Sequence, residues 1–140
     1  MKNAQPAITV QIIVNAPIDK VWNSFTAPEH IVNWSFASDD WHTPEAENDL
    51  RTGGKFRSKM AAKDGSMSFD FEGEYVKVEE FKKIEYVIAD GRHVAVSFED
   101  LGEKVKVAET FDPENMNSPE LQQEGWQAIL DNFKKYTETL

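Results

Sequence analysis

Residues 117–136 read NSPELQQEGWQAILDNFKKY and are predicted to form the longest helix of the chain. Asn117 or Ser118 can cap its first turn, and Pro119 lies near the first helical position, where a missing N–H does no harm. At about 100° per residue, one face of the helix collects the apolar residues Leu121, Gly125, Trp126, Ile129, Phe133, Tyr136 and Leu140. A helix with one apolar face needs an apolar surface to lie on. The rest of the chain is predicted to provide that surface.

The composition bounds the class of protein. The 140 residues fit one domain, residues 1–140, with a sizeable core. The formal net charge of −10 disfavours nucleic acid and anionic membrane surfaces, which recruit basic faces. The chain contains no Cys, which excludes disulfides and thiolate chemistry. We find no signal peptide and no apolar run approaching the ~18 residues of a membrane helix. A cytoplasmic protein without membrane insertion is therefore expected.

The first part of the chain is predicted to form a strand and two helices. Residues 7–14 are rich in β-branched side chains, as expected of a strand. Residues 18–25 then place Ile18, Val21, Trp22 and Phe25 on one face of a helix. Thr26 followed by Glu29 gives a second start signal, for a short helix that continues through Trp34.

From residue 41 onward, turn signals recur about every ten residues and predict an antiparallel meander. A turn at Asp64-Gly65 sets the register of one hairpin. The opposite-charge pairs then share one face: Lys59 with Asp70, Arg57 with Glu72, and Lys55 with Glu74. The other face takes Met60 opposite Phe69, Ser58 opposite Phe71, and Phe56 opposite Gly73. One solvated and one buried sheet face are expected.

Two further hairpins follow. A three-residue loop at 89–91, with Gly91 left-handed, pairs Tyr86 with Val94 and Ile84 with Val96. A turn at Leu101-Gly102 would pair Phe98 with Val105 and Val96 with Val107, which places Glu109 inward beside Val94. Phe69, Phe71 and Tyr75 are assigned inward, yet so are Val76 and Val78, which strict alternation along one strand does not allow. A bulge near residues 73–76 would resolve this conflict and curve the sheet. The predicted fold is α+β, in the order β-α-α-β6-α, with a curved antiparallel sheet wrapped around the C-terminal helix.

Four segments resemble the activator of heat-shock protein 90 ATPase homologue family. They are VNAPIDKVW at 14–22, DLRTGGKF at 49–56, GEYVKV at 73–78 and GWQAILDNF at 125–133. The resemblance covers nearly the whole chain. It implies the START-like, or Bet v 1-like, helix-grip fold with a cavity under the long helix. Related folds bind lipids, sterols, hormones or polyketides, and some are cyclases. The eukaryotic members stimulate a chaperone ATPase and have another domain, whereas a single domain is expected for this chain.

The cavity is the main candidate site. Its predicted lining, taken from the inner faces of the strands and the helix, is Trp34, Trp41, Phe56, Met60, Phe69, Phe71, Tyr86, Val96, Phe98, Val107, Glu109, Gly125, Ile129 and Phe133. Gly125 either leaves room for a ligand or lets another element approach closely. Glu109 is either a polar anchor for a ligand head group, with Arg51 as its partner, or a strand-end residue that reaches solvent.

No catalytic or metal constellation is visible. His30, His42 and His93 lack metal-ligand spacing, and no cofactor motif is present. The leading hypothesis is a non-enzymatic protein that binds a small hydrophobic ligand, lipid-like or aromatic. One alternative is a co-chaperone-like module that binds a chaperone or another protein. The other is a cyclase-like enzyme, which would need an inward acid–base pair.

Overall fold

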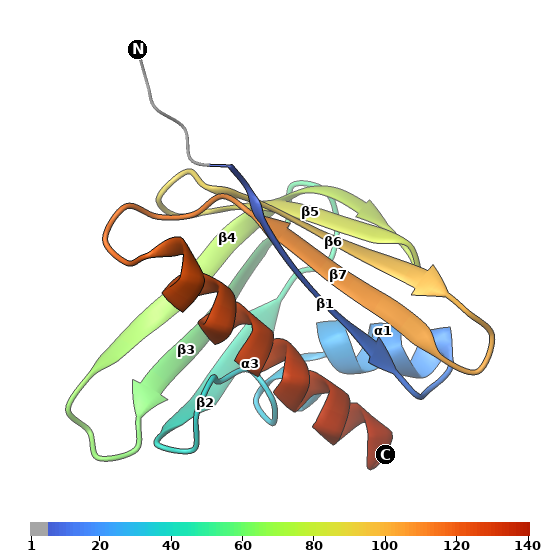
Figure 1. Ribbon diagram of the computed structural model, residues 1–140, viewed down its shortest axis with the longest axis horizontal. Coiled ribbons are helices and arrows are strands. Elements are labelled where there is room, and N and C mark those ends of the chain that lie inside the picture. Colours follow the sequence, from blue (N-terminus) through green and yellow to red (C-terminus); the bar gives the residue numbers. More distant parts are fainter. Residues whose placement is uncertain (1–5) are drawn as a thin grey trace.

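A computed structural model describes residues 6–140 of the protein (Figure 1). The elements in chain order are β1 (Ile8–Val14), α1 (Ile18–Thr26), α2 (Pro28–Ile31), β2 (Trp41–Asn48), β3 (Lys55–Ala62), β4 (Ser68–Glu79), β5 (Lys83–Ile88), β6 (His93–Asp100), β7 (Val105–Phe111) and α3 (Pro119–Glu138). This order confirms the predicted succession of one strand, two helices, six strands and a long helix.

Within residues 6–140, the seven strands form one antiparallel sheet, in the order β1-β7-β6-β5-β4-β3-β2. The first two strands of the chain therefore lie at opposite edges of the sheet. The connection between them runs through α1 and α2, at one end of the sheet. The sheet is curved, and α3 crosses its concave side (Figure 1). No helix within residues 6–140 has the length and apolar character needed to cross a membrane.

The hairpin of β3 and β4 has the predicted register, with Lys55 opposite Glu74 and Ser58 opposite Phe71. Arg57, however, forms its ion pairs with Asp70 and with Glu47 of the neighbouring strand. The predicted bulge is also confirmed, because the register of β4 against β5 shifts between Tyr75 and Lys77. This shift turns Val76 toward solvent, whereas Tyr75 stays buried. A bulge of this kind increases the local bend of a strand.

The β5–β6 hairpin is also as predicted, and Gly91 has φ of 91°. The predicted register of β6 and β7 is wrong by two residues. Phe98 lies opposite Val107, and Val96 lies opposite Glu109. The reason is a longer loop, in which Leu101 N–H donates to Lys104 O and the Asp100 carboxylate accepts from Gly102 N–H. An even shift preserves the inner and outer faces, so Glu109 still points inward.

The N-cap of α3 is Ser118, whose hydroxyl accepts a hydrogen bond from Leu121 N–H. The predicted buried face of this helix is wrong at both ends, because Leu121 and Leu140 are exposed. The buried positions are Gln122, Leu130, Phe133 and Thr137. The helix packs closely along edge strand β1, where Gln127 Nε2 donates to Gln11 O and Lys134 Nζ donates to Ile13 O. These bonds use backbone acceptors on a strand edge that could otherwise pair with another chain.

The second predicted helix is shorter than expected. Helix α2 comprises four residues and ends at Ile31, before Trp34. Thr26 does not cap it, since the Thr26 hydroxyl donates to Trp22 O inside α1. The predicted apolar stripe of α1 is confirmed, with Val21 and Trp22 buried and Ile18 and Phe25 packed against the core.

Candidate functional site

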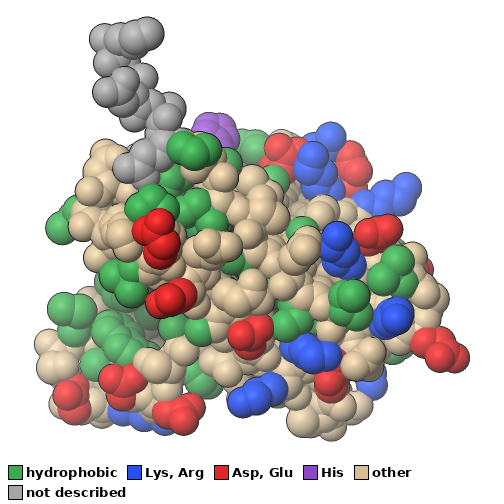
Figure 2. Space-filling view, in the orientation of Figure 1, with side chains coloured by type: hydrophobic (Ala, Val, Ile, Leu, Met, Phe, Trp, Pro, Cys, Tyr) green, Lys and Arg blue, Asp and Glu red, His purple; other side chains and the backbone are tan. Residues whose placement is uncertain are grey.

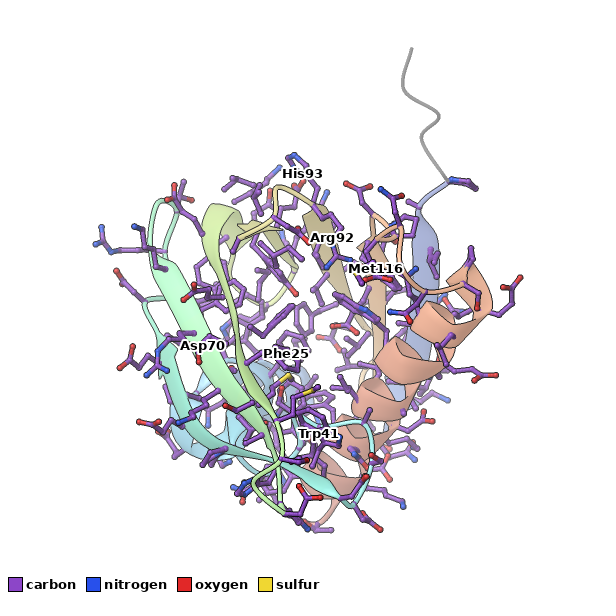
Figure 3. The ribbon with its side chains drawn as sticks, turned by 90° about the vertical axis from the view of Figure 1, so that its left-hand side faces the viewer. Phe25, Trp41, Asp70, Arg92, His93 and Met116 are labelled. Atoms are coloured by element: carbon purple, nitrogen blue, oxygen red, sulfur yellow. The ribbon has the colours of Figure 1, made fainter. Side chains whose placement is uncertain are left out.

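A cavity of about 350 Å³ lies between the concave face of the sheet and α3. Its walls come from β3, β4, β5 and β7, from α1 and α2, and from the first half of α3. Seen from the side (Figure 3), Phe25 lies between the sheet and the helix, with Arg92 and Met116 toward one end and Trp41 toward the other. Exposed residues such as Phe69 and Asn117 form part of the lining, so the cavity reaches solvent.

The structure brings eight of the predicted site residues together around this cavity. They are Trp34, Phe56, Met60, Phe69, Phe71, Tyr86, Glu109 and Ile129. Phe69 lies at the rim, where 49% of its surface is exposed. The rings of Phe56, Tyr75 and Tyr86 contact one another, with centroids of Phe56 and Tyr86 4.8 Å apart. The wall on this side is therefore a continuous aromatic surface.

Six predicted site residues do not line the cavity: Trp41, Val96, Phe98, Val107, Gly125 and Phe133. Val96, Phe98, Val107 and Phe133 are fully packed in the core. Phe98 and Phe133 are covered by Phe25, whose ring meets theirs edge to face, at centroid distances of 5.4 and 5.2 Å. Aromatic side chains thus fill the part of the concave face that lies behind Phe25.

Trp41 and Gly125 lie outside the cavity for different reasons. Trp41 is on edge strand β2 and contacts the ring of Phe69, at a centroid distance of 5.9 Å. Gly125 is partly buried, but a Cβ built on it would meet no atom within 4 Å. The alternative that Gly125 permits a close approach is therefore wrong. The prediction that it makes room in the cavity is not supported either, since its neighbour Trp126 provides the wall.

Several lining residues were not predicted. They include Phe25, Ile31, Ser58, Tyr75, Arg92, Glu114, Gln122 and Trp126. Phe25 and Trp126 belong to apolar helix faces that the sequence does show, and Ser58 and Tyr75 belong to inner strand faces. Arg92 and Glu114 lie in loops. Loop side chains follow no periodic pattern, so no signal in the sequence could place them.

Glu109 is the carboxyl group that β7 places on the inner wall of the cavity. It is 8% exposed, and within residues 6–140 its carboxyl forms no hydrogen bond or ion pair with another group. Burial raises the pKa of Glu109 to about 8. The prediction of Arg51 as its partner is wrong, because Arg51 is exposed and pairs with Asp49 at 2.9 Å. The alternative that Glu109 reaches solvent at a strand end is wrong as well.

Two buried tyrosines line the wall near Glu109. Tyr75 donates a hydrogen bond of 2.6 Å to Asn48 Oδ1, and Asn48 in turn donates to Thr26 O. Burial raises the pKa of the Tyr75 hydroxyl and also that of the Tyr86 hydroxyl, where the nearby Glu109 adds to the effect. Both hydroxyl groups are neutral at physiological pH. They add polar atoms to the cavity without adding charge.

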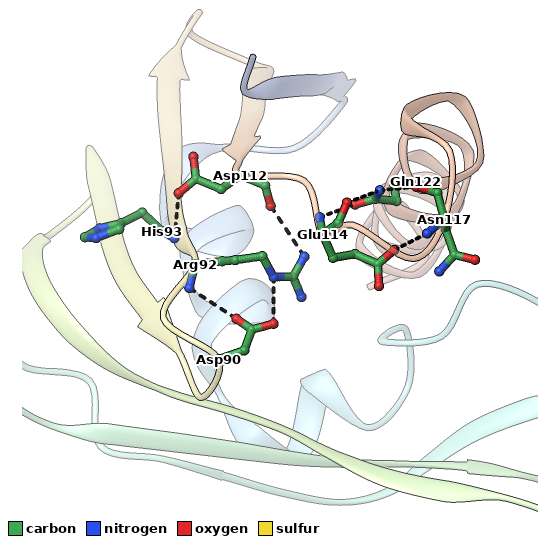
Figure 4. Close-up of polar contacts among 7 residues, drawn as sticks. All are labelled: Asp90, Arg92, His93, Asp112, Glu114, Asn117 and Gln122. Atoms are coloured by element: carbon green, nitrogen blue, oxygen red, sulfur yellow. Dashed lines mark hydrogen bonds and ion pairs between the residues drawn. The ribbon is translucent and has the colours of Figure 1, made fainter. Parts of the chain in front are cut away.

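The open end of the cavity is held by a polar network (Figure 4). Arg92 Nε donates to Asp90 Oδ2 at 2.8 Å, and Arg92 Nη1 donates to Asp112 O at 3.4 Å. Gln122, at the start of α3, accepts from Glu114 N–H and donates to Glu114 O and Asn117 O. The amide of Gln122 thereby fixes the loop between β7 and α3 against the helix.

Within residues 6–140, no group of three or more His, Asp or Glu side chains is placed to hold a metal ion. His30 instead contacts Tyr136, with its Nδ1 at 2.5 Å from the hydroxyl oxygen.

The curved antiparallel sheet, the long helix on its concave face and the cavity between them define the helix-grip class, also called START-like or Bet v 1-like. Residues 15–138 match the family described as "Activator of Hsp90 ATPase homolog 1-like protein", and the chain belongs to this family. The resemblance found in the sequence motifs is thereby confirmed.

Solved structures agree with this assignment. The AHSA1-like protein from Aeromonas hydrophila is 43% identical, with a TM-score of 0.86 over 94% of this chain and 93% of that one. A protein from Cytophaga hutchinsonii is 53% identical, with a TM-score of 0.82 over 95% of this chain and 92% of that one. A protein from Nitrosomonas europaea shares the fold alone, at 16% identity and a TM-score of 0.82 over 99% and 97%. No curated protein sequence matches the chain.

Proposed function

We propose that the protein binds a small, largely apolar ligand, aromatic or lipid-like, in the cavity between the sheet and α3. The observation that carries this proposal is the hollow of about 350 Å³ between the sheet and α3. Protein cores are close-packed, and voids larger than a water molecule are few. Ligand sites, in contrast, are mostly apolar clefts of roughly 300–1,000 Å³ with a few polar groups.

Two serines offer a matched test of this proposal. Ser58 lies on the inner face of β3 and lines the cavity, whereas Ser97 is exposed on β6 between the buried Val96 and Phe98. Ser58→Leu would fill part of the cavity, and Ser97→Leu adds the same atoms to the outer face. We expect ethylnaphthalene to quench the tryptophan fluorescence of the parent protein and of Ser97→Leu. Ser58→Leu should weaken this binding at least tenfold, by the loss of space.

Native mass spectrometry of gently purified protein complements the titration. A co-purifying apolar molecule that is absent from Ser58→Leu would identify the natural class of ligand. If the parent, Ser97→Leu and Ser58→Leu bind ethylnaphthalene with equal affinity, the probe binds outside the cavity and the proposal is contradicted. Thermal unfolding of each variant shows whether it has folded.

A second candidate is acid–base catalysis, and Glu109 is the observation that favours it. A carboxyl with pKa about 8 near a tyrosine hydroxyl has the character of a general acid or base at neutral pH. The same pair would serve a cyclase-like reaction on a bound ligand. If a co-purified molecule is converted on incubation with the protein, and is bound without conversion by Glu109→Gln, this candidate replaces simple binding.

The co-chaperone candidate rests on the family description and on a surface feature. Met67 and Phe69 are 61% and 49% exposed at the start of β4. Figure 2 shows hydrophobic side chains gathered at this end of the β3–β4 hairpin, at the lower left, with acidic side chains beside them. Such a patch can dock on another protein. The steady-state ATPase rate of purified Hsp90 should then rise when the protein is added, and Met67→Ser with Phe69→Ser should remove the increase.

A further inference from the structure

The carboxyl of Glu109 lies on the cavity wall and has no protein partner in the described part of the chain, and its oxygens are accessible from the cavity, so a hydrogen bond to them must come from whatever occupies that space. A buried polar group without a hydrogen bond costs free energy, and native structures leave few of them. Glu109 is inward-facing on β7, between Val10 of β1 and Val96 of β6. Its side chain projects from the concave face of the sheet and lines the cavity.

None of the other titratable groups on the cavity wall supplies the missing partner. Tyr75 is bound to Asn48, and Tyr86 forms no hydrogen bond with Glu109. Arg92 is held at the open end by Asp90 and Asp112 O. The carboxylate of Glu114 accepts from Asn117 N–H, in the loop before α3.

The remaining elements around Glu109 contribute no charge. The helices α1, α2 and α3 reach the cavity with apolar, aromatic or amide side chains, Gln122 and Trp126 among them. Among residues 6–140, no cation is placed to stabilise an ionised Glu109, and the pKa of about 8 means that its carboxyl keeps its proton at neutral pH. A protonated carboxyl has one O–H donor to satisfy.

We propose that Glu109 decides which ligands the cavity accepts, by donating a hydrogen bond from its protonated carboxyl to an acceptor oxygen of an uncharged, otherwise aromatic ligand, such as an aryl ketone. This inference rests on the proposed binding function and specifies its ligand class. Anionic ligands are excluded, because the cavity offers them no uncompensated positive charge. Cationic ligands are disfavoured, because they would require Glu109 to give up its proton inside an aromatic cavity.

A hydrogen bond made in the cavity replaces one made with water, so its net effect is modest. We expect a carbonyl ligand to bind roughly three- to tenfold more tightly than a hydrocarbon of the same shape. Because such a ligand binds the protonated form of Glu109, the preference should hold below the pKa and be lost as the pH rises above about 8. A cationic ligand would show the opposite dependence.

The test compares three probes of similar size by tryptophan quenching or calorimetry. Ethylnaphthalene has no polar group, acetylnaphthalene carries a carbonyl acceptor, and naphthylmethyl-trimethylammonium carries a permanent charge. Each is titrated at about pH 6 and about pH 9.5, on either side of the titration of Glu109. The proteins are the parent, Glu109→Gln, Glu109→Leu and, as a control on the outer face of β6, Glu99→Gln, since Glu99 is exposed.

We expect the parent and Glu99→Gln to prefer acetylnaphthalene at the lower pH only. Glu109→Gln should keep the preference at both values, since its amide donates at any pH. Glu109→Leu should lose the preference and still bind ethylnaphthalene. If ethylnaphthalene binds and acetylnaphthalene gains nothing from Glu109, the inference is wrong and the proposed function stands. Tightest binding of the ammonium probe, rising with pH, would also overturn it. If no probe binds the parent, both the inference and the proposed function fail.

Discussion

The indole of Trp126 stacks on the ring of Phe111, with centroids 4.0 Å apart and ring planes inclined by 9°. Trp126 belongs to α3, and Phe111 is the last residue of β7, two positions beyond Glu109 on the same inner face. The stack therefore fastens the helix to the sheet next to the cavity. Trp126 also contacts Phe71 across the cavity, at a centroid distance of 6.2 Å.

Removal of this stack should loosen the helix. We expect Trp126→Ala to lower the free energy of unfolding by about 2–4 kcal/mol, because a large, partly buried aromatic side chain is lost. Trp126→Phe keeps a ring against Phe111 and should lose less than half of that. Urea denaturation at equilibrium measures both changes. Equal stability of Trp126→Ala and the parent would show that the contact with Phe111 contributes nothing.

Two glycines should respond in opposite ways to the same substitution. Gly125 lies inside α3 with open space where a Cβ would be, so Gly125→Ala should stabilise the protein by about 0.5–1 kcal/mol. At Gly73 a Cβ would lie 2.5 Å from Val87 O, so Gly73→Ala should destabilise it by about 1–3 kcal/mol. Thermal and urea denaturation of the two variants provide the comparison. A destabilised Gly125→Ala would mean that the space beside α3 is needed.

The buried carboxyl makes stability depend on pH. The pKa of Glu109 is about 8 in the folded protein and near its ordinary value of 4.5 in the unfolded chain. Between these values the folded state holds a proton that the unfolded state has lost, so rising pH favours unfolding. This contribution is fully present below about pH 4.5 and is lost as the pH rises through about 8.

The corresponding measurement is the unfolding free energy of the parent and of Glu109→Gln across that range. Because the Gln side chain does not titrate, the parent should lose stability relative to the variant with rising pH, by up to a few kcal/mol. Glu99→Gln, on the exposed outer face, should leave the slope unchanged. Parallel curves for the parent and Glu109→Gln would contradict the burial of this carboxyl.

The loop at the open end of the cavity depends on Gln122. Its amide nitrogen donates to Glu114 O and Asn117 O (Figure 4). Gln122→Glu has the same shape but cannot donate when ionised, and it would place a negative charge against two carbonyls. We expect a loss of about 1–3 kcal/mol and faster amide exchange in residues 112–118. Gln123→Glu, at an exposed neighbouring position, is the control, and equal exchange in the two variants would contradict this role.

The hairpins show which part of the fold is encoded locally. The register of β3 and β4 was predictable because a turn at Asp64-Gly65 and three cross-strand charge pairs agree on one alignment. The register of β6 and β7 was not, because Asp100 and Leu101 build a longer loop than the Leu101-Gly102 pair suggests. The inner and outer faces were still correct there, since they depend only on parity.

For the candidate site, the sequence could predict only which residues lie on the concave face of the sheet. Glu109, Tyr86 and Phe56 could be assigned to the concave side by alternation along their strands, but so could Phe98 and Val107, which are packed in the core. Phe98 is kept from the cavity by the ring of Phe25, which comes from α1. No local pattern states how far a side chain from one element reaches into the space left by another.

The sequence by itself therefore determined the order of the elements, the inner and outer faces of the β3–β4, β5–β6 and β6–β7 hairpins and the family of the chain. These features follow from periodicity, turn chemistry and motifs, all of which act over a few residues. The tertiary structure alone decided that a cavity remains between the sheet and α3, that Glu109 has no protein partner in it, and that Gln122 fixes the loop between β7 and α3. These features depend on how the curved sheet and α3 share the interior, and residues more than a hundred positions apart take part in it.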